Sequence, residues 1–489
     1  MSHSSPDLDP RRRRRELQES SLEVADVLVV GGGITGAGVA LDAASRGLSV
    51  TLIEAEDLAF GTSRFSSKLV HGGLRYLATG DVATAKESAQ ERHLLMTTIA
   101  PHLIRPLAQL LPFRPGVTWR QRSAGAVGMA LGDLLRMQAR TSRSVLPAPR
   151  PVAARTARRL FPALDARGLR GGMLSYDGQL VDDARLVVTV ARTAAGMGAR
   201  ILTRVRAEQL RSDGAAVTDE LTGERFEIRA RSVINATGVW AGTLDNAISV
   251  RPSRGTHIVL DAADLGHPSA ALTIPHEGSI SRYVFALPQR GGRVIVGLTD
   301  ESAPGPVPRV AEATEPEIAF LLSTLNRVVS TPIRRDQVRG AFAGLRPLVD
   351  NGADTTADVS RRHLVAVSDG GFVTVLGGKL TTYRRMAEDA VDLAVRTRGL
   401  SPAPSRSASI RLIEEDMVGR ARIADAGAEV AEGIAITRAE IEFAVRAEGA
   451  MTVDDVMERR TRIGLVDADS DRSRHAVEEI VAQTLAQID

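Results

Sequence analysis

Short apolar runs and an alanine-rich segment alternate near the start of the chain. The run Val27–Val30 leads into a glycine-rich turn and then into a segment rich in alanine that ends at Gly47. A second apolar run, Val50–Ile53, follows. Apolar runs of this length are typical of buried strands, and the alanine-rich segment between them has the length and composition of a helix. The pattern predicts a strand–helix–strand unit of an α/β fold.

Further along the chain, the pattern predicts more helices and a region of short strands. Helices are expected at 82–100, 185–198, 315–329 and 381–398, with further helices in the tail. Strands are expected near 201–205, 232–235, 257–260, 282–287, 293–298, 364–367 and 372–376. The closely spaced strands between 250 and 300 indicate an antiparallel sheet, and the Ser/Pro/Ala-rich stretch 400–408 is typical of a linker.

The composition excludes several classes of site. The chain has 489 residues and no Cys, so it has no disulfides, cysteine nucleophiles or thiolate metal sites. No apolar run approaches the roughly 18 residues of a membrane-spanning helix. The arginine run Arg11–Arg15 is followed by the polar stretch Glu16–Glu23 rather than by an apolar core. We therefore predict a disordered basic leader over residues 1–22 and a cytoplasmic protein.

Charge is distributed unevenly along the chain. Residues 101–160 contain eleven Arg and one acidic residue, whereas residues 411–489 contain ten Arg and 18 acidic residues. From the basic segment we predict that the protein binds peripherally to anionic lipids on the inner face of the cell membrane. The alternative is that it offsets the acidic tail within the folded protein. Few aromatic residues accompany these arginines, so a nucleic-acid partner is not expected.

The clearest motif is the glycine turn between the two predicted strands. Gly31, Gly33 and Gly36 have the spacing G-x-G-x-x-G, and Glu54 ends the second strand. The first glycine permits the tight turn, the second lets a pyrophosphate approach the backbone, and the third lets the helix pack on the strand. The acid is placed to accept hydrogen bonds from ribose hydroxyls. The unit predicts a dinucleotide cofactor, either NAD or FAD.

Two other glycine-rich segments carry polar side chains. The segment 61–76 interleaves glycine with four hydroxyl groups and with Lys68 and His71, and the segment 377–383 presents Lys379 at a predicted helix start. Such loops offer donors to a cofactor and positive charge to an anionic substrate. Only three of the 62 basic residues are Lys, which singles out Lys379 as a compact point charge.

Seven stretches together resemble the FAD-dependent glycerol-3-phosphate dehydrogenase family, in the family's order. They are Gly31–Gly38, Ser66–Leu77, Val181–Leu186, Asn235–Gly238, Gly255–Val259, Gly344–Leu348 and Gly377–Arg384. The Ser-Ser-Lys-Leu-Val-His-Gly-Gly-Leu-Arg-Tyr sequence within the second stretch is highly specific. Residues 442–465 are similar to the family's helical C-terminal domain, but the chain is shorter than the family between 410 and 435.

The resemblance implies a fold class and a domain layout. It implies an α/β protein in which an FAD-binding, Rossmann-like domain of the glutathione-reductase or D-amino-acid-oxidase type is interleaved with an antiparallel-sheet substrate domain. The FAD-binding domain is expected to be discontinuous, with residues 23–100, 170–245 and 340–399. The substrate or cap domain would comprise 101–169 and 246–339, and the C-terminal helical domain 409–489.

The resemblance also implies the reaction, oxidation of sn-glycerol 3-phosphate to dihydroxyacetone phosphate with hydride transfer to FAD. The substrate-side residues it implies are His257, Arg75, Tyr76, Arg346, Arg361 and Lys379. His257 is the first choice for the base and His71 the alternative. The cofactor-binding residues expected are Gly31, Gly33, Gly36, Glu54, Thr62, Ser63, Ser67, Lys68, His71, Gly72, Gly73, Val205, Thr237, Gly238, Gly378 and Thr381. No metal site is expected.

Several alternatives stay open at this point. A quinone is the expected electron acceptor, and a glycerol-3-phosphate oxidase that uses O2 is the alternative. A related FAD-dependent amine or amino-acid oxidase would need a carboxylate site rather than a phosphate site. The sequence also leaves the oligomeric state open, with a homodimer as one option.

Overall fold

The predicted strand–helix–strand unit forms the centre of an eight-stranded sheet. The computed structural model describes residues 4–73, 76, 80–114, 119–276, 282–349 and 363–488, with only the backbone described at 119–127. The sheet consists of β17 (His363–Val367), β18 (Val373–Gly377), β10 (Arg225–Asn235), β1 (Val24–Val30), β2 (Val50–Glu54) and β7 (Arg200–Thr203), in that spatial order, with β8 (Val205–Arg211) and β9 (Gly214–Asp219) as a hairpin joined to β10. From β18 to β7 the neighbours are parallel. This is the Rossmann-like sheet that the sequence predicted.

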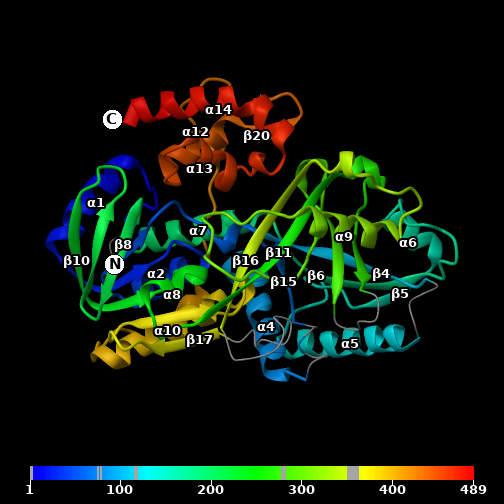
Figure 1. The fold of residues 1–489 in the computed structure, drawn as a ribbon, viewed down its shortest axis with the longest axis horizontal. Coiled ribbons are helices and arrows are strands. Elements are labelled where there is room, and N and C mark those ends of the chain that lie inside the picture. Colours follow the sequence, from blue (N-terminus) through cyan, green and yellow to red (C-terminus); the bar gives the residue numbers. More distant parts are fainter. Residues whose placement is uncertain are drawn as a thin grey trace.

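A second sheet of ten strands lies beside the first (Figure 1). It consists of β15 (Glu301–Ser302), β11 (Val250–Asp261), β14 (Arg293–Gly297), β13 (Tyr283–Pro288), β12 (Ala271–Pro275), β4 (Ile104–Pro112), β6 (Gly172–Leu180) and β3 (Leu69–Val70), with β16 (Gly340–Val349) on β11 and β5 (Arg150–Val152) on β6. Most of its pairs are antiparallel, as expected. Three of its strands, β3, β6 and β16, lie in the residue ranges that were expected for the FAD-binding domain.

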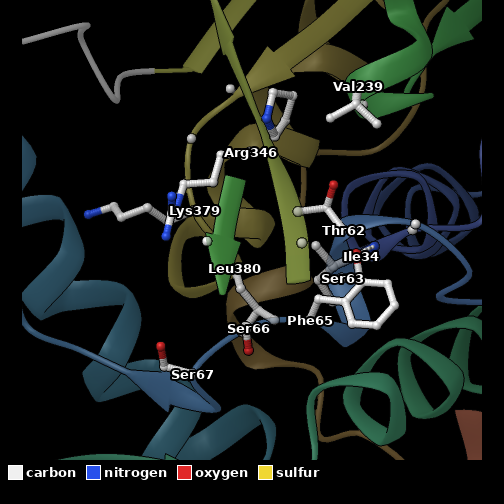
Figure 2. Close-up of a pocket in the computed structure, with 18 of the residues that line it drawn as sticks. Ile34, Thr62, Ser63, Phe65, Ser66, Ser67, Val239, Arg346, Lys379 and Leu380 are labelled. Atoms are coloured by element: carbon white, nitrogen blue, oxygen red, sulfur yellow. Dashed lines mark hydrogen bonds between the residues drawn. The ribbon is translucent and has the colours of Figure 1, made fainter. Parts of the chain in front are cut away.

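The two sheets enclose a cavity beside the glycine-rich turn (Figure 2). The second, ten-stranded sheet is covered by α9 (Glu315–Asn326) and α6 (Ala154–Leu160), whose apolar residues share a core with β11–β14. Two further helices, α4 (Val82–Leu94) and α5 (Trp119–Gln138), pack against each other. The helix predicted at 82–100 is therefore present, with its last turn, Leu95–Ile99, wound more widely as a π-helix.

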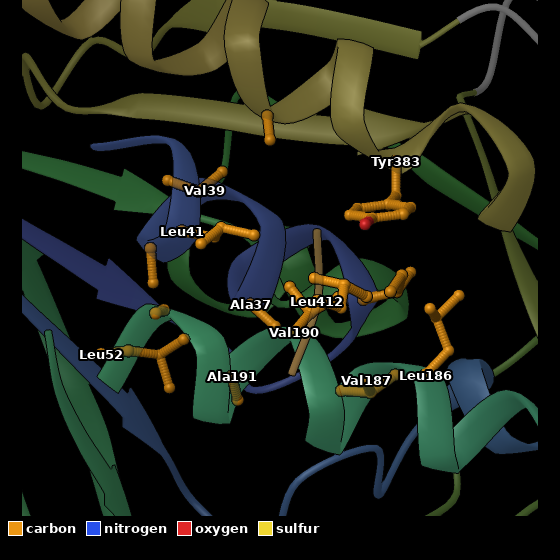
Figure 3. Close-up of a cluster of buried hydrophobic side chains, with 14 of the residues drawn as sticks. Ala37, Val39, Leu41, Leu52, Leu186, Val187, Val190, Ala191, Tyr383 and Leu412 are labelled. Carbon is orange, nitrogen blue, oxygen red and sulfur yellow. The ribbon is translucent and has the colours of Figure 1, made fainter. Parts of the chain in front are cut away.

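Successive apolar side chains of β1 point to opposite faces of the parallel sheet, so the sheet has an apolar core on each face. Val27 and Val29 face the helices α2 (Ile34–Ser45), α7 (Asp183–Gly196) and α10 (Tyr383–Arg398), whereas Leu28 and Val30 face the β8–β9–β10 side. Figure 3 shows the helical side, where small residues of α2 lie between the apolar side chains of α7 and the ring of Tyr383. Burial on both faces is typical of strands in a parallel sheet.

The first residues form a helix rather than the predicted disordered leader. Helix α1 (Pro10–Leu22) begins at Asp9, which accepts a hydrogen bond from the Arg12 amide. Arg12 and Arg13 are both buried. Arg12 donates to the carbonyls of Ala195 and Ala199, and Arg13 donates to the carbonyl of Thr203. The arginine run looked like a solvated charge cluster in the sequence, but its partners come from residues almost 200 positions away.

The C-terminal residues form a separate small domain (Figure 1, red and orange). It contains α11 (Met417–Arg420), α12 (Arg438–Ala447), α13 (Val453–Asp455) and α14 (Asp467–Ile488), and a hairpin of β19 (Glu429–Ala431) and β20 (Ile434–Thr437). Helices α12 and α14 pack around an apolar core of their own. The predicted helical tail is therefore present with a two-stranded hairpin added. Within the described residues, no helix has both the length and the hydropathy required to cross a bilayer.

A substitution tests whether α1 is part of the folded protein. Arg13 forms an ion pair of 2.6 Å with the buried carboxylate of Asp219. We expect Arg13→Met to lower the free energy of unfolding by about 3 kcal/mol, because it leaves that carboxylate without its cation. Arg11 on the same helix is exposed, and Arg11→Met should change the value by less than about 0.5 kcal/mol. Urea unfolding of both variants measures this, and equal effects would contradict the buried role of Arg13.

Candidate active site

A cavity of about 1250 Å³ lies between the two sheets and receives residues from both. The parallel sheet contributes the glycine-rich turn after β1, the end of β2 and the turn after β10. The antiparallel sheet contributes side chains of β11, β12, β13 and β16. The site therefore has one wall built around backbone amides and another built from side chains.

The glycine-rich turn is shaped by close backbone contacts. Gly31 has a φ of +111°, and a Cβ there would lie 2.7 Å from the carbonyl oxygen of Ala236. A Cβ at Gly36 would lie 1.8 Å from the carbonyl oxygen of Gly31, so Gly36 allows α2 to pack on the turn. Gly33 precedes the first residue of α2 and has no side chain to bond the first amides. Gly33 and the first residues of α2 line the cavity, where the positive end of the helix dipole suits a pyrophosphate.

Glu54 lies at the end of β2, as predicted, and lines the cavity. One carboxylate oxygen accepts from the Gly32 amide at 2.6 Å and the other from the Glu56 amide at 2.9 Å. Burial raises the pKa of Glu54, and the two amides counteract part of that effect. The carboxylate is thus held in one orientation at the strand end, where a ribose can donate hydrogen bonds to it.

The loop between β2 and β3 supplies hydroxyl groups to both walls. Thr62 donates to the Leu345 carbonyl at 2.6 Å, and Ser63 accepts from the Ile34 amide at 3.0 Å. Ser67 lies 2.8 Å from Nε2 of His257. Thr62, Ser63 and Ser67 all line the cavity, as expected for cofactor-binding residues. Figure 2 shows them on the same loop, with Ser67 lying apart from the other two.

His257 occupies a fully buried position on β11. Its ring stacks on Phe342 of the adjacent strand, with the ring centroids 4.8 Å apart. A Cβ at Gly297 would lie 2.1 Å from the imidazole, so this glycine makes room for the ring. Burial, together with the positive charges of Arg346 and Lys68, lowers the pKa of His257 to about 3. The imidazole is therefore neutral at physiological pH.

Arg346 is held in place from three sides. Its guanidinium donates to Ser253 and Asp300 at 3.2 Å each and to the Thr299 carbonyl at 3.1 Å. A Cβ at Gly255 would lie 2.3 Å from the guanidinium, so that glycine clears its path. Arg346 lines the cavity. These contacts fix a fork of donors that matches the paired oxygens of an anionic group.

Lys379 extends from the turn after β18 and also lines the cavity. Its ammonium nitrogen bonds Ser88 of α4 and lies 4.2 Å from the centre of the Tyr76 ring. In Figure 2, Lys379 and Arg346 point in the same direction. A strand and a turn thus each place a cation on the wall of a cavity that His257 also lines.

The remaining predicted residues divide into three groups. His71, Val205, Thr237, Gly238, Gly378 and Thr381 line the cavity. Gly72 and Gly73 lie against Arg92 and Ser88 rather than on the cavity wall. Arg75 and Arg361 lie outside the described residues.

Lys68, a predicted cofactor-binding residue, has its side chain paired with two carboxylates and is not among the residues that line the cavity. Its ammonium group forms ion pairs with Asp182 at 2.9 Å and Asp183 at 2.5 Å, and it is buried. The charge is therefore used to hold the loop against the start of α7. Its neighbours in sequence gave no sign of these carboxylates, which lie more than 110 residues away.

The structure adds residues that sequence reasoning missed. Trp240 lines the cavity and packs on Gly61, where a Cβ would lie 2.8 Å from its ring. Asp300 and Thr299, which orient Arg346, follow β14 in a stretch without a recognised motif. The predicted turn at Asn235–Gly238 could have pointed to Trp240, which follows it by two residues.

Comparison with known proteins agrees with this geometry. The family model for FAD-dependent oxidoreductases matches residues 26–384, so the fold and the site define this class. A model for the C-terminal domain of alpha-glycerophosphate oxidase matches residues 411–487. "Glycerol-3-phosphate dehydrogenase 1" of Mycobacterium tuberculosis is 48% identical, with 99% of this chain and 100% of that protein covered.

Two other similar proteins cover most of this chain. The mitochondrial glycerol-3-phosphate dehydrogenase of Arabidopsis thaliana is 37% identical over 81% of this chain and 67% of its own length. The glycerol-3-phosphate dehydrogenase of Bacillus halodurans, solved in complex with FAD, is 25% identical and superposes with a TM-score of 0.72, covering 98% of this chain and 96% of that one. The chain belongs to the FAD-dependent glycerol-3-phosphate dehydrogenases.

The residues of this structure fit the FAD of that family. A Cβ would lie 2.7 Å from the Ala236 carbonyl oxygen at Gly31 and 3.2 Å from Ser63 Oγ at Gly33, and both glycines line the cavity. The cavity also reaches Glu54 at one strand end and Lys379 at another. When FAD binds, Gly31 and Gly33 would hold its pyrophosphate and Glu54 its ribose. Lys379 would offer a positive charge.

The depressed pKa of His257 makes a prediction about stability against pH. The pKa is about 3 in the folded protein and 6.5 in the reference state, so the unfolded chain takes up the proton first as the pH falls. Stability is therefore lost below pH 6.5, by about 2 kcal/mol at pH 5. In His257→Gln this loss should be smaller by that amount. Urea unfolding at pH 8 and pH 5 measures it, with the exposed His475→Gln as the control; the same loss in all three proteins would contradict the prediction.

Proposed function

We propose that this enzyme oxidises sn-glycerol 3-phosphate to dihydroxyacetone phosphate and delivers the electrons to a quinone. The proposal depends mainly on one observation: the neutral, buried His257 and the cations Arg346 and Lys379 line the same cavity as the glycine-rich turn after β1. The relatives, named glycerol-3-phosphate dehydrogenases, support the same substrate. Bound FAD supplies the acceptor for the hydride that leaves C2 of the substrate.

The protein groups have separate tasks in this reaction. His257 accepts the proton of the C2 hydroxyl while C2 loses its hydride, which converts the alcohol to a ketone. Ser67, bonded to Nε2, orients the imidazole. Arg346 and Lys379 bind the phosphate and stabilise the negative charge that develops during the reaction.

The same features favour phosphate over the carboxylate that an amino-acid oxidase would bind. A carboxylate carries a single charge, whereas a phosphate monoester carries close to two near neutral pH. Arg346 lies on β16 and Lys379 in the turn after β18, and both line the cavity, so two cations are available to a doubly charged group. Glycine oxidases share the fold at 18% identity or less, which is a likeness of fold alone.

The acceptor is proposed from the surface beside the cavity. Helix α5 has Gly128, Met129 and Leu131 on the cavity wall. Leu131 at the cavity edge is 41% exposed, and Leu134 and Met137 further along the helix are 48% and 57% exposed. An exposed apolar helix face next to a redox site suits contact with a bilayer, where quinones dissolve. We also propose that the enzyme can form a homodimer, as the sequence analysis allowed.

The expected role of arginines in that contact changes. Arg136 belongs to the basic segment 101–160 that was expected to contact the membrane, but it is buried, pairs with Asp133 at 2.6 Å and donates to the Thr141 carbonyl. The side chains of Arg120 and Arg122 lie outside the described residues. The apolar face of α5 therefore replaces Arg136 as the basis of the proposed membrane contact.

Flavin reduction tests the substrate and the cations. The purified enzyme should be yellow and should bleach when glycerol 3-phosphate is added under nitrogen. Arg346→Ala should raise the substrate concentration needed, and Lys379→Ala should slow bleaching, each by about 10- to 100-fold, as expected for lost charge-assisted bonds of about 1.5–3 kcal/mol. The exposed cations Lys86 and Arg334 supply control variants to Ala, which should stay within about twofold.

Two outcomes of that experiment would count against the proposal. Bleaching by an amino acid but not by glycerol 3-phosphate would favour the amino-acid oxidase. Reoxidation of the bleached enzyme by air but not by a soluble quinone would favour the O2-dependent oxidase.

Vesicle co-sedimentation tests the membrane contact. We expect the enzyme to sediment with vesicles that contain anionic lipid, and the triple variant Leu131→Ser, Leu134→Ser, Met137→Ser to lose most of that binding, because the buried apolar area disappears. A matched triple variant at Leu221, Val310 and Val418, exposed apolar residues elsewhere, should bind normally. Loss of binding in both triple variants, or no binding by the wild type, would contradict the proposed contact.

A further inference from the structure

The C-terminal domain contacts one loop of the FAD-binding domain through a dense set of charges. This loop, residues 55–68 between β2 and β3, is called the cofactor loop here because Thr62 and Ser63 lie on it. Apart from the single turn Thr62–Arg64, it has no helix or strand. Loops without regular structure lose much conformational entropy when they are ordered, so their positions depend on the contacts that hold them.

Asp57 is the centre of the contact. It is 1% exposed, and its carboxylate accepts from Arg459 at 2.6 Å and from both terminal nitrogens of Arg460 at 2.8 and 2.9 Å. Arg459 also bonds Asp455, which pairs with Arg204 at the start of the β7–β8 turn. The pKa of Arg460 is raised despite its burial, because Asp57 stabilises the charged guanidinium. These groups hold the first part of the loop against the C-terminal domain.

A second contact holds the other part of the loop. Arg64 forms an ion pair of 3.0 Å with Glu458 of the C-terminal domain. Arg462 donates to the Arg64 carbonyl at 2.6 Å, and its guanidinium lies 3.3 Å from Asp182. Asp182 also pairs with Lys68, the last residue of the loop. The C-terminal domain therefore reaches the loop directly at Arg64 and, through Asp182, at its end.

The opposite side of the same loop forms the active site. Ala59 donates its amide to the Gly32 carbonyl in the glycine-rich turn at 3.0 Å. Ser63 bonds the first amide of α2, and Ser67 bonds His257. A movement of the loop would thus displace the pyrophosphate cradle, the helix start and the partner of the base together.

We propose that the C-terminal domain positions the cofactor loop, so that its arginines Arg459, Arg460 and Arg462 maintain FAD affinity and the geometry around His257 without touching either. They are positioning residues that act through Asp57, Arg64 and Asp182. The contacts lie on the side of the loop that faces the C-terminal domain, and the cofactor and base contacts lie on the other. The tail thereby becomes part of the cofactor site.

Release of FAD from the intact holoenzyme tests the proposal without reference to the substrate. Arg462→Gln removes the contacts to the Arg64 carbonyl and Asp182, and Glu458→Gln removes the charge partner of Arg64 at a position whose side chain is 36% exposed. Arg446→Gln is the matched control, because Arg446 pairs with Glu442 inside the C-terminal domain at 2.7 Å. Free FAD is measured by its fluorescence after dilution and ultrafiltration.

We expect the dissociation constant of FAD to rise at least tenfold in Arg462→Gln and about threefold in Glu458→Gln, and to stay within twofold in Arg446→Gln. The near-UV and visible circular dichroism of the bound flavin should also change in Arg462→Gln at saturating FAD, which a general loss of stability would not cause. If Arg462→Gln fails to fold, Glu458→Gln decides the matter.

An unchanged dissociation constant and flavin spectrum in Glu458→Gln and Arg462→Gln would overturn the proposal. So would an equal rise in Arg446→Gln, since that would show an effect of domain stability alone. Because the measurement contains no glycerol 3-phosphate, its failure is distinct from a failure of the proposed reaction.

Discussion

The packing of α2 against the turn after β1 is the constraint on which the rest of the site depends. A single Cβ at Gly36 would lie 1.8 Å from the Gly31 carbonyl oxygen. Gly36 thus lets the helix start approach the turn, and in the same way Gly32 makes room for Glu54 at the end of β2 and Gly31 for Ala236 after β10. The close approach exposes amides to the cavity and brings Glu54 within hydrogen-bond distance of the Gly32 amide. The nucleotide wall is therefore made mainly by backbone geometry.

The opposite wall depends on side chains that are held by partners far away in sequence. His257 is neutral because burial and two neighbouring cations disfavour its charged form. Arg346 stays charged and oriented through Ser253, Asp300 and a carbonyl group. A buried charge costs several kcal/mol unless it is paired, so each cation in the cavity needs its own set of acceptors. This explains why residues without a recognised motif, such as Asp300, belong to the site.

Some arginines of this chain have structural roles as buried partners of carboxylates. The sequence does not distinguish them from the many other arginines. Arg13 on the first helix and Arg460 in the tail are both buried, and each bonds a carboxylate from a distant part of the chain. The five donors of a guanidinium can satisfy a carboxylate and a carbonyl together, as Arg460 does with Asp57 and Glu448. The predicted disordered leader was wrong for this reason. A run of arginines has the same appearance whether its partners are water or buried carboxylates.

The sequence by itself determined the strand–helix–strand unit and the glycine turn with Glu54, and it singled out His257, Arg346 and Lys379, which line the cavity. These signals are local, because strand periodicity and glycine spacing depend on neighbours within a few residues, or they belong to motifs of the family. Only the tertiary structure decided that Lys68 binds Asp182 and Asp183, and that β3, β6 and β16 join the second sheet. Pairing of strands and of buried charges is set by groups far apart along the chain, and it forms only when the whole fold brings them together.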